Sequence, residues 1–147
     1  MADIAGAKAA IRAYLAAHWS GAAVIWPNGP PPVTQDANGD PVPYVYGEIN
    51  IVAAGIRGVG KPGAHVVIDD GLISLHVFVP SGDGTADADA MAGALGEVFR
   101  VKQFYDTEPG ACVRTWTPRV GDGEPNADNG MRYRVTVSIP FEFWHRA

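Results

Sequence analysis

Apolar residues near the N-terminus recur at the spacing of a helix. The segment Ala2–Trp19 is rich in alanine, lacks proline and has Asp3 near its start. Lys8 and Arg12 lie away from its apolar stripe, which consists of Ile4, Ile11, Leu15 and Trp19. Ser20–Gly21 then predicts the end of the helix, because glycine adopts the left-handed conformation of a helix C-terminus without steric cost. The pattern predicts an amphipathic helix over Ala2–Trp19.

A second helix is predicted from Ala86 to about Tyr105. Its inward stripe consists of Met91, Leu95, Val98, Phe99 and the stem of Lys102. Asp87 and Asp89 near its start favour the helix dipole. The preceding turn, Ser81–Gly84, lies where a helix N-terminus binds anions, but Asp83 and the two helix carboxylates would repel a phosphate. We therefore interpret the turn as a helix cap.

The clearest strand is Tyr133–Phe143, where apolar and polar residues alternate with period two. Its inward face consists of Tyr133, Val135, Val137, Ile139, Phe141 and Phe143. Its other face consists of Arg132, Arg134, Thr136, Ser138 and Glu142. Pro140 has no N–H for the sheet ladder, so we expect this strand at a sheet edge or with a bulge near its end.

Further strands are predicted from apolar runs and from alternation. They are Ala22–Trp26, Tyr44–Ala54, a strand over Ala64–Ile68 and Leu72–Val79 that is broken or bulged at Asp69–Gly71, and Ala111–Val120. The element order is α-β-β-β-α-β-β. It predicts an α+β fold in which two helices pack on one face of a mainly antiparallel sheet, within a single domain of residues 1–147.

Three loops of unusual composition connect these elements. Pro27–Pro43 is rich in proline, and a packed domain usually keeps so long a loop for binding or assembly. Gly55–Gly63 is rich in glycine and carries Arg57 and Lys61, whereas Gly121–Gly130 is acidic. The basic loop is either a docking arm for an acidic surface on a neighbouring protein or a solvated hairpin tip.

The segment Gly55–Lys61 also matches the first seven positions of a phosphate-binding P-loop. Pro62 stands where that motif requires Ser or Thr to hold magnesium. The segment also leads into a predicted strand, whereas a P-loop opens onto a helix N-terminus. We therefore expect no nucleotide binding at this loop.

Other patterns of chemically active residues are weak. The run Asp122, Glu124, Asn126 and Asp128 alternates oxygen ligands, but it lacks EF-hand spacing and Pro125 interrupts it. The four histidines form no zinc-binding pair, and a GxSxG elbow is absent. Cys112 lies in a strand pattern, where cysteine usually acts as a small hydrophobe, and Asp69–Asp70 suit a turn better than a carboxylate pair. We predict no cofactor, no metal and no enzymatic activity.

Composition narrows the class of protein. Of the 147 residues, 47% are hydrophobic and the net charge is −5, which argues against the clustered Lys and Arg of a nucleic-acid-binding surface. A single cysteine forms no internal disulfide. The N-terminus lacks a signal-peptide pattern, and no apolar stretch approaches the ~20 residues that span a bilayer. We expect a soluble, unsecreted protein without a membrane partner.

Three segments follow one another in a recognisable order. An N-terminal helix leads to an apolar strand that ends in Trp26-Pro27-Asn28, before the proline-rich loop. The strand ending VFVPSGDG, residues 77–84, leads into an alanine-rich helix, and the chain closes on YRVTVSIPF, residues 133–141. In order, spacing and chain length, the sequence resembles the tail-terminator family of long-tailed phages and phage-derived gene transfer agents over nearly its whole length.

The resemblance implies a structural virion protein that forms a homohexameric ring on the last tail-tube ring. Such a ring stops tube polymerisation and presents a surface to the head connector or neck protein. The implied partners are further copies of the chain, the tail tube protein and the connector, with assembly in the bacterial cytoplasm. DNA only passes through the lumen, which suits a net negative chain. Our candidate assembly residues are Trp26, Asn28, Arg57, Lys61, Arg132 and Arg134.

The sequence pattern is shared by other classes of protein. A neighbouring tail-completion or head-to-tail joining protein would share much of the pattern. A small α+β enzyme would need a polar pocket, and a peptide-binding module would add a strand to its sheet edge. Light scattering would separate these classes, because only the terminator strongly predicts a ring.

Overall fold

The computed structural model describes residues 2–61, 65–80, 86–125 and 132–146. Its helices are α1 (Ile4–His18) and α2 (Ala86–Phe99). Its strands are β1 (Ala23–Ile25), β2 (Tyr44–Val59), β3 (Val66–Pro80), β4 (Gln103–Phe104), β5 (Cys112–Thr115), β6 (Arg119–Val120), β7 (Glu124–Pro125) and β8 (Arg132–Arg146). The turn Ser81–Gly84 and the second half of the acidic run, Asn126 and Asp128, lie outside the described residues.

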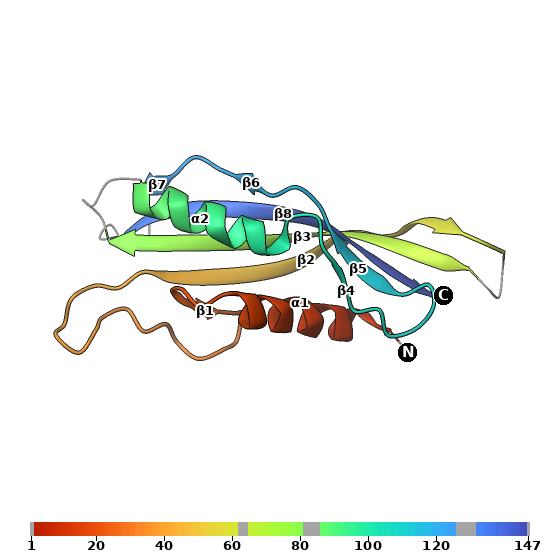
Figure 1. The fold of residues 1–147 in the computed structure, drawn as a ribbon, viewed down its shortest axis with the longest axis horizontal. Coiled ribbons are helices and arrows are strands. Elements are labelled where there is room, and N and C mark those ends of the chain that lie inside the picture. Colours follow the sequence, from red (N-terminus) through yellow and green to blue (C-terminus); the bar gives the residue numbers. More distant parts are fainter. Residues whose placement is uncertain (1, 62–64, 81–85, 126–131, 147) are drawn as a thin grey trace.

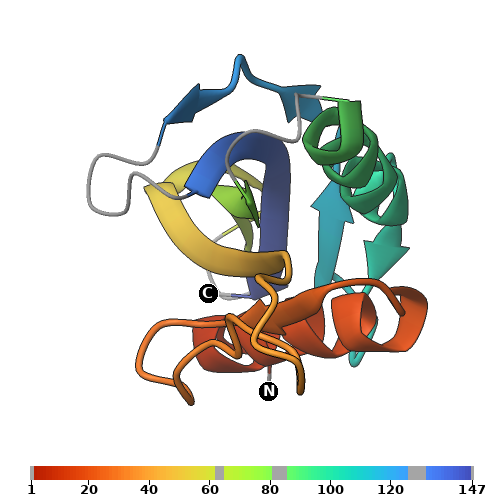
Figure 2. The same ribbon diagram turned by 90° about the vertical axis from the view of Figure 1, so that its left-hand side faces the viewer.

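The strands form one curled sheet in the order β1-β2-β3-β8-β5-β4, and β6 and β7 also pair with β8. All neighbours are antiparallel except β1 and β2, which are parallel. The long strands β2, β3 and β8 run along the length of the molecule, as Figure 1 shows. The helices pack against the sheet from one side, α1 along β2 and α2 near β8 (Figure 2). The predicted α+β fold is therefore confirmed.

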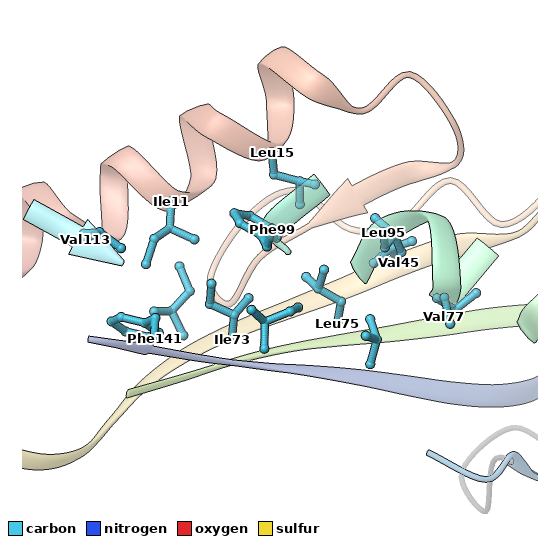
Figure 3. Packing of buried hydrophobic residues seen from close by; sticks show 14 of the residues in the cluster. Ile11, Leu15, Val45, Ile73, Leu75, Val77, Leu95, Phe99, Val113 and Phe141 are labelled. Carbon is cyan, nitrogen blue, oxygen red and sulfur yellow. The ribbon is translucent and has the colours of Figure 1, made fainter. Parts of the chain in front are cut away.

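The core lies between the helices and the inner face of the sheet (Figure 3). On β8 the residues at odd positions from Val135 to Phe143 are buried and their neighbours are half-buried or exposed, which confirms the predicted register. On α1 the buried residues are Ala7, Ile11 and Leu15. Ile4 belongs to the predicted stripe, but in the first turn of α1 it is 38% exposed.

The second helix is shorter than its sequence pattern suggested. It ends at Phe99, so Lys102 lies outside it and is exposed. The buried Thr115 hydroxyl donates to the Phe99 carbonyl and accepts from the Lys102 N–H at 2.9 Å. Those two bonds satisfy main-chain groups at the helix end, and the chain then turns into β4. The inward face of α2 consists of Ala88, Ala92, Leu95, Gly96 and Phe99, whereas Met91 and Val98 are only partly buried.

The predicted break at Asp69–Gly71 is wrong, because β3 is continuous and the irregularity lies in the strand beside it. The β2–β3 register shifts between Ile51 and Ala53 and again between Ala53 and Arg57. Asp69 faces the second irregularity, where its carboxylate accepts from the N–H of Gly55 and from Nε2 of His145 at 3.0 Å. Gly55 has a φ of +63°, a conformation that glycine adopts at little cost. The acidic residue thus holds a bulge of β2 rather than making a turn of its own.

Pro140 also contradicts expectation, because β8 is an interior strand with β3 on one side and β5, β6 and β7 on the other. Its carbonyl accepts from the Trp116 N–H at 2.9 Å. The nitrogen and oxygen of one extended residue point to the same side, so the Pro140 nitrogen faces the break between β5 and β6, where the ladder needs no donor. The predicted strand Ala111–Val120 is divided at this break, which contains Pro118.

One close contact yields a test of the packing. A side chain at Gly71 would bring its Cβ to 2.8 Å from the Asn50 carbonyl oxygen and into the ring of Phe141. We expect Gly71→Ala to destabilise the fold by about 1–3 kcal/mol, because main chain in the paired strand cannot move aside. The matched control is Gly93→Ala on α2, where the added Cβ meets no atom within 4 Å apart from the helix's own backbone, and alanine should stabilise the helix by about 0.5–1 kcal/mol. Urea unfolding of both variants measures the difference.

Candidate assembly surfaces

The first candidate surface is the β2–β3 hairpin, which extends beyond both helices at the end of the molecule that holds the two termini (Figure 1). Arg57 is not in a loop, as we expected, but in β2, paired with Ile68 of β3. Lys61 follows β2 and is exposed. The P-loop match also lies on a strand as far as Val59, so it lacks the strand-to-helix connection of a nucleotide site.

The second candidate surface is the turn after β1. Gly29 donates its N–H to the Trp26 carbonyl at 3.1 Å, and Asn28 between them has a φ of 58°. Proline followed by a left-handed Asn is the pattern of a type II turn. The indole of Trp26 packs against the core and lies over Gly47, where any Cβ would clash with it. Asn28 is exposed, so this turn presents an amide to solvent while Trp26 anchors it.

Arg132 was expected at the surface, but it is only 4% exposed. Its guanidinium donates to the Val42 carbonyl at 2.5 Å and to the Thr34 carbonyl at 2.7 Å, and it lies 5.4 Å from the centre of the Tyr44 ring. These contacts join the start of β8 to both sides of the proline-rich loop. Arg132 therefore holds that loop in place.

Arg134 is half-buried on the face of the sheet opposite the core, paired in register with Phe78 and Glu124. Farther along this face, His76 contacts Thr136 through Nδ1 at 2.7 Å and Glu48 through Nε2 at 2.8 Å. The polar cluster spans β2, β3 and β8. Sequence patterns did not indicate it, because its three members are far apart in the chain.

The six candidate residues do not form one site. On β3 the partner of Arg57 is Ile68 and the partner of Arg132 is Pro80. Those partners are 12 residues apart (80 − 68), which at ~3.3 Å per residue is about 40 Å. The hairpin residues therefore lie at one end of the sheet, and Arg132 and Arg134 lie at the other with the proline-rich loop. Any assembly role divides between two ends of the molecule.

The sequence pattern does not reveal a group of exposed apolar side chains. Val101 is 61% exposed, Trp116 44% and Val120 42%, and the Val101 N–H donates to the Trp116 carbonyl at 3.5 Å. On the other side of the sheet, Val52 of β2 is 70% exposed. The sequence pattern predicts Val101 within a helix and Trp116 within a strand. It does not indicate that both side chains are exposed to solvent.

The hollows of the described surface differ in their lining, and one of about 600 Å³ is lined by Asp106, Glu108 and Arg114 among other residues. One hollow of about 530 Å³ lies between Trp19, the proline-rich loop and α2, and Asp87 is its one titratable lining residue. Within residues 2–61, 65–80, 86–125 and 132–146, no three His, Cys, Asp or Glu side chains are grouped as metal ligands. Burial raises the pKa of the Cys112 thiol, which disfavours the reactive thiolate. Among these residues, no helix is long and apolar enough to cross a membrane.

The buried arginine gives the second test. Arg132→Met should remove the guanidinium hydrogen bonds to the carbonyls of Thr34 and Val42, because methionine keeps the length of the side chain without its donors. We expect a loss of stability of about 1–3 kcal/mol and faster protease cleavage within Pro27–Pro43. Arg119→Met removes an exposed arginine from β6 and should change neither quantity. Equal cleavage rates in the two variants would show that Arg132 does not hold the loop.

Comparison with known proteins adds the following findings. The family of the phage tail terminator protein matches residues 7–141. One solved structure aligns with 95% of this chain and 97% of its own length, with a TM-score of 0.60 and 19% sequence identity. That degree of likeness establishes a shared fold. No curated protein matches the chain.

Proposed function

Because the chain belongs to the phage tail terminator family, and is thus a structural component of a phage tail, we propose that it forms a ring on the end of the tail tube. The ring stops addition of further tube subunits and offers its free face to the head connector or neck protein. The family match over residues 7–141 is the observation that carries this proposal.

The edges of the sheet support ring formation. β1 covers only Tyr44–Tyr46 of β2, so from Gly47 on β2 has β3 as its one neighbour among the described strands. The opposite edge is β4, which pairs only with β5. A monomer with two different open edges is suited to head-to-tail contacts, and such contacts close into a ring when the rotation per subunit divides a full turn.

The two ends of the molecule suit the two partners of such a ring. The proline-rich loop, held by Arg132, lies at one end of the sheet, and the hairpin with Arg57 and Lys61 extends from the other. Strands parallel to the ring axis would direct one end at the tube and the other at the head. We propose that the basic hairpin docks on an acidic surface of one of these neighbours, since opposite charges steer docking and fix its register.

The net charge of −5 fits passage of DNA through the ring. Adhesion to DNA requires Lys and Arg against successive phosphates, and an acidic chain offers few of them. DNA would then slide through the lumen without being held.

Removal of the gene tests the proposed function. Without the protein, tube subunits should continue to add, so electron micrographs of lysates should show headless tails that are longer than wild type and variable in length. Complementation with the intact gene should restore both the length and the attached heads. Tails of normal length that lack heads would instead assign the chain to head-to-tail joining.

A further inference from the structure

The strongest unexplained features are two exposed apolar sites on opposite edges of the sheet. The first is Val52, which lies at the first irregularity of β2 and is 70% exposed. The second is the pair Val101 and Trp116, in the segments that precede β4 and follow β5. Figure 2 shows β2 and the β4–β5 edge on opposite sides of the molecule. No face of a single subunit brings the two sites together.

The backbone at Val101 makes its exposure informative. Its φ is +50°, a region in which a β-branched residue is a clear outlier. Such a conformation costs about 1–2 kcal/mol, and here it leaves an apolar side chain 61% exposed to water. The left-handed turn ends α2 and leads into β4, and the Val101 N–H donates to the Trp116 carbonyl, but most of the Val101 side chain gains no burial within the subunit. An exposed β-branched side chain at such a position is free to contact a second molecule.

The register of the sheet places both sites on one row. Val52 stands between Ile51 and Ala53, whose partners on β3 are Gly71 and Asp70. Those two residues pair with Phe141 and Glu142 on β8, and these in turn pair with Thr115 and Arg114 on β5. Arg114 pairs with Gln103 on β4, and Thr115 accepts from the Lys102 N–H. Val101 and Trp116 are the next residues along the chain, so the two sites differ by about one residue in the register of the sheet.

We propose that Val52 of one copy packs against Val101 and Trp116 of the next copy, forming the contact between neighbouring subunits of the ring. Two unlike surfaces on opposite edges suit a head-to-tail contact, and such contacts make a ring when the rotation per subunit closes. The open edge of β2 beyond Gly47 lies beside Val52 and supplies main-chain hydrogen-bonding groups to the same interface. This inference rests on the proposed ring and names its subunit interface.

Paired cysteines test the contact directly. The double variant Val52→Cys, Val101→Cys carries both halves of the contact and should form a ladder of covalent multimers on mild oxidation, both as purified protein and in assembled tails. In a mixture of the two single variants, each subunit carries a cysteine on only one of its two edges. Crosslinking of the mixture should therefore stop at the covalent dimer. Each single variant alone should stay uncrosslinked, because the contact is between unlike sites. Dimers from Val52→Cys alone, or an uncrosslinked double variant in both preparations, would overturn the proposal.

A matched substitution separates the contact from the fold. Val52→Asp places a charge in the interface and should weaken assembly at least about tenfold in light scattering, with unchanged thermal unfolding of the monomer. Val33→Asp makes the same change at a valine that is 67% exposed in the proline-rich loop, and it should assemble as wild type does. If Val52→Asp forms rings at wild-type concentration, the interface is wrong and the terminator function stands. If wild-type protein forms no ring even on tails, the proposed function itself fails.

Discussion

Val137→Asp should leave the protein unfolded or insoluble. Val137 is fully buried on β8 among the side chains of both neighbouring strands and α2, and the register places it opposite Leu75. A carboxylate there has no partner, and an uncompensated buried charge costs about 3–5 kcal/mol. Since a domain of this size is stable by only about 5–15 kcal/mol, such a loss removes much or all of its stability. Circular dichroism with urea titration of the soluble fraction measures it.

Thr136→Asp is the control, one residue away on the other face of the same strand. Thr136 is half-buried, and its hydroxyl contacts Nδ1 of His76. A carboxylate at position 136 could hydrogen-bond to the same imidazole nitrogen. The substitution should cost about 1 kcal/mol or less. A reversed result, in which Thr136→Asp is the damaging variant, would mean that the register of β8 is shifted by one residue.

Reversal of the hairpin charges should abolish productive assembly without unfolding the protein. In the variant Arg57→Glu, Lys61→Glu, a docking partner with an acidic surface would meet like charge, at a cost of several kcal/mol. Because each 1.4 kcal/mol is a factor of ten, binding to that partner should weaken by about a hundredfold or more. The measurement is the titre of infectious particles from a host that supplies only this variant.

The control for charge alone is Arg12→Glu, Arg119→Glu, which changes two exposed arginines on α1 and β6 by the same total charge. This control should give a near-normal titre and an unchanged unfolding curve. A normal titre from the hairpin variant as well would reduce the hairpin to a solvated tip, which is the alternative that its composition allows.

The sequence predicted those parts of the fold in which local pattern and tertiary burial agree. Strand β8 alternates strictly, and its buried face follows that alternation from Val135 to Phe143. Helix α1 follows its apolar stripe at Ile11 and Leu15. In both elements the periodicity of the chain and the position of the core require the same side chains to face inward.

The remaining features depend on contacts between distant segments. The end of α2 is set by Thr115, which lies 16 residues beyond Phe99. Pro140 is tolerated in an interior strand because the gap between β5 and β6 lies opposite its nitrogen. That gap depends on the sequence of β5 and β6 and not on the sequence around Pro140. Arg132 is buried because the carbonyls of the proline-rich loop fold back over it. Local patterns contain no information on such pairings, and they placed Arg132 with the exposed candidates.

Electron microscopy of assembled particles that carry a labelled copy of this protein tests the central claim most directly. The account predicts a single closed ring at the head-proximal end of each tail tube, with β2 of each subunit beside the β4–β5 edge of the next. A label distributed along the tube, at the distal tip or within the head would contradict it.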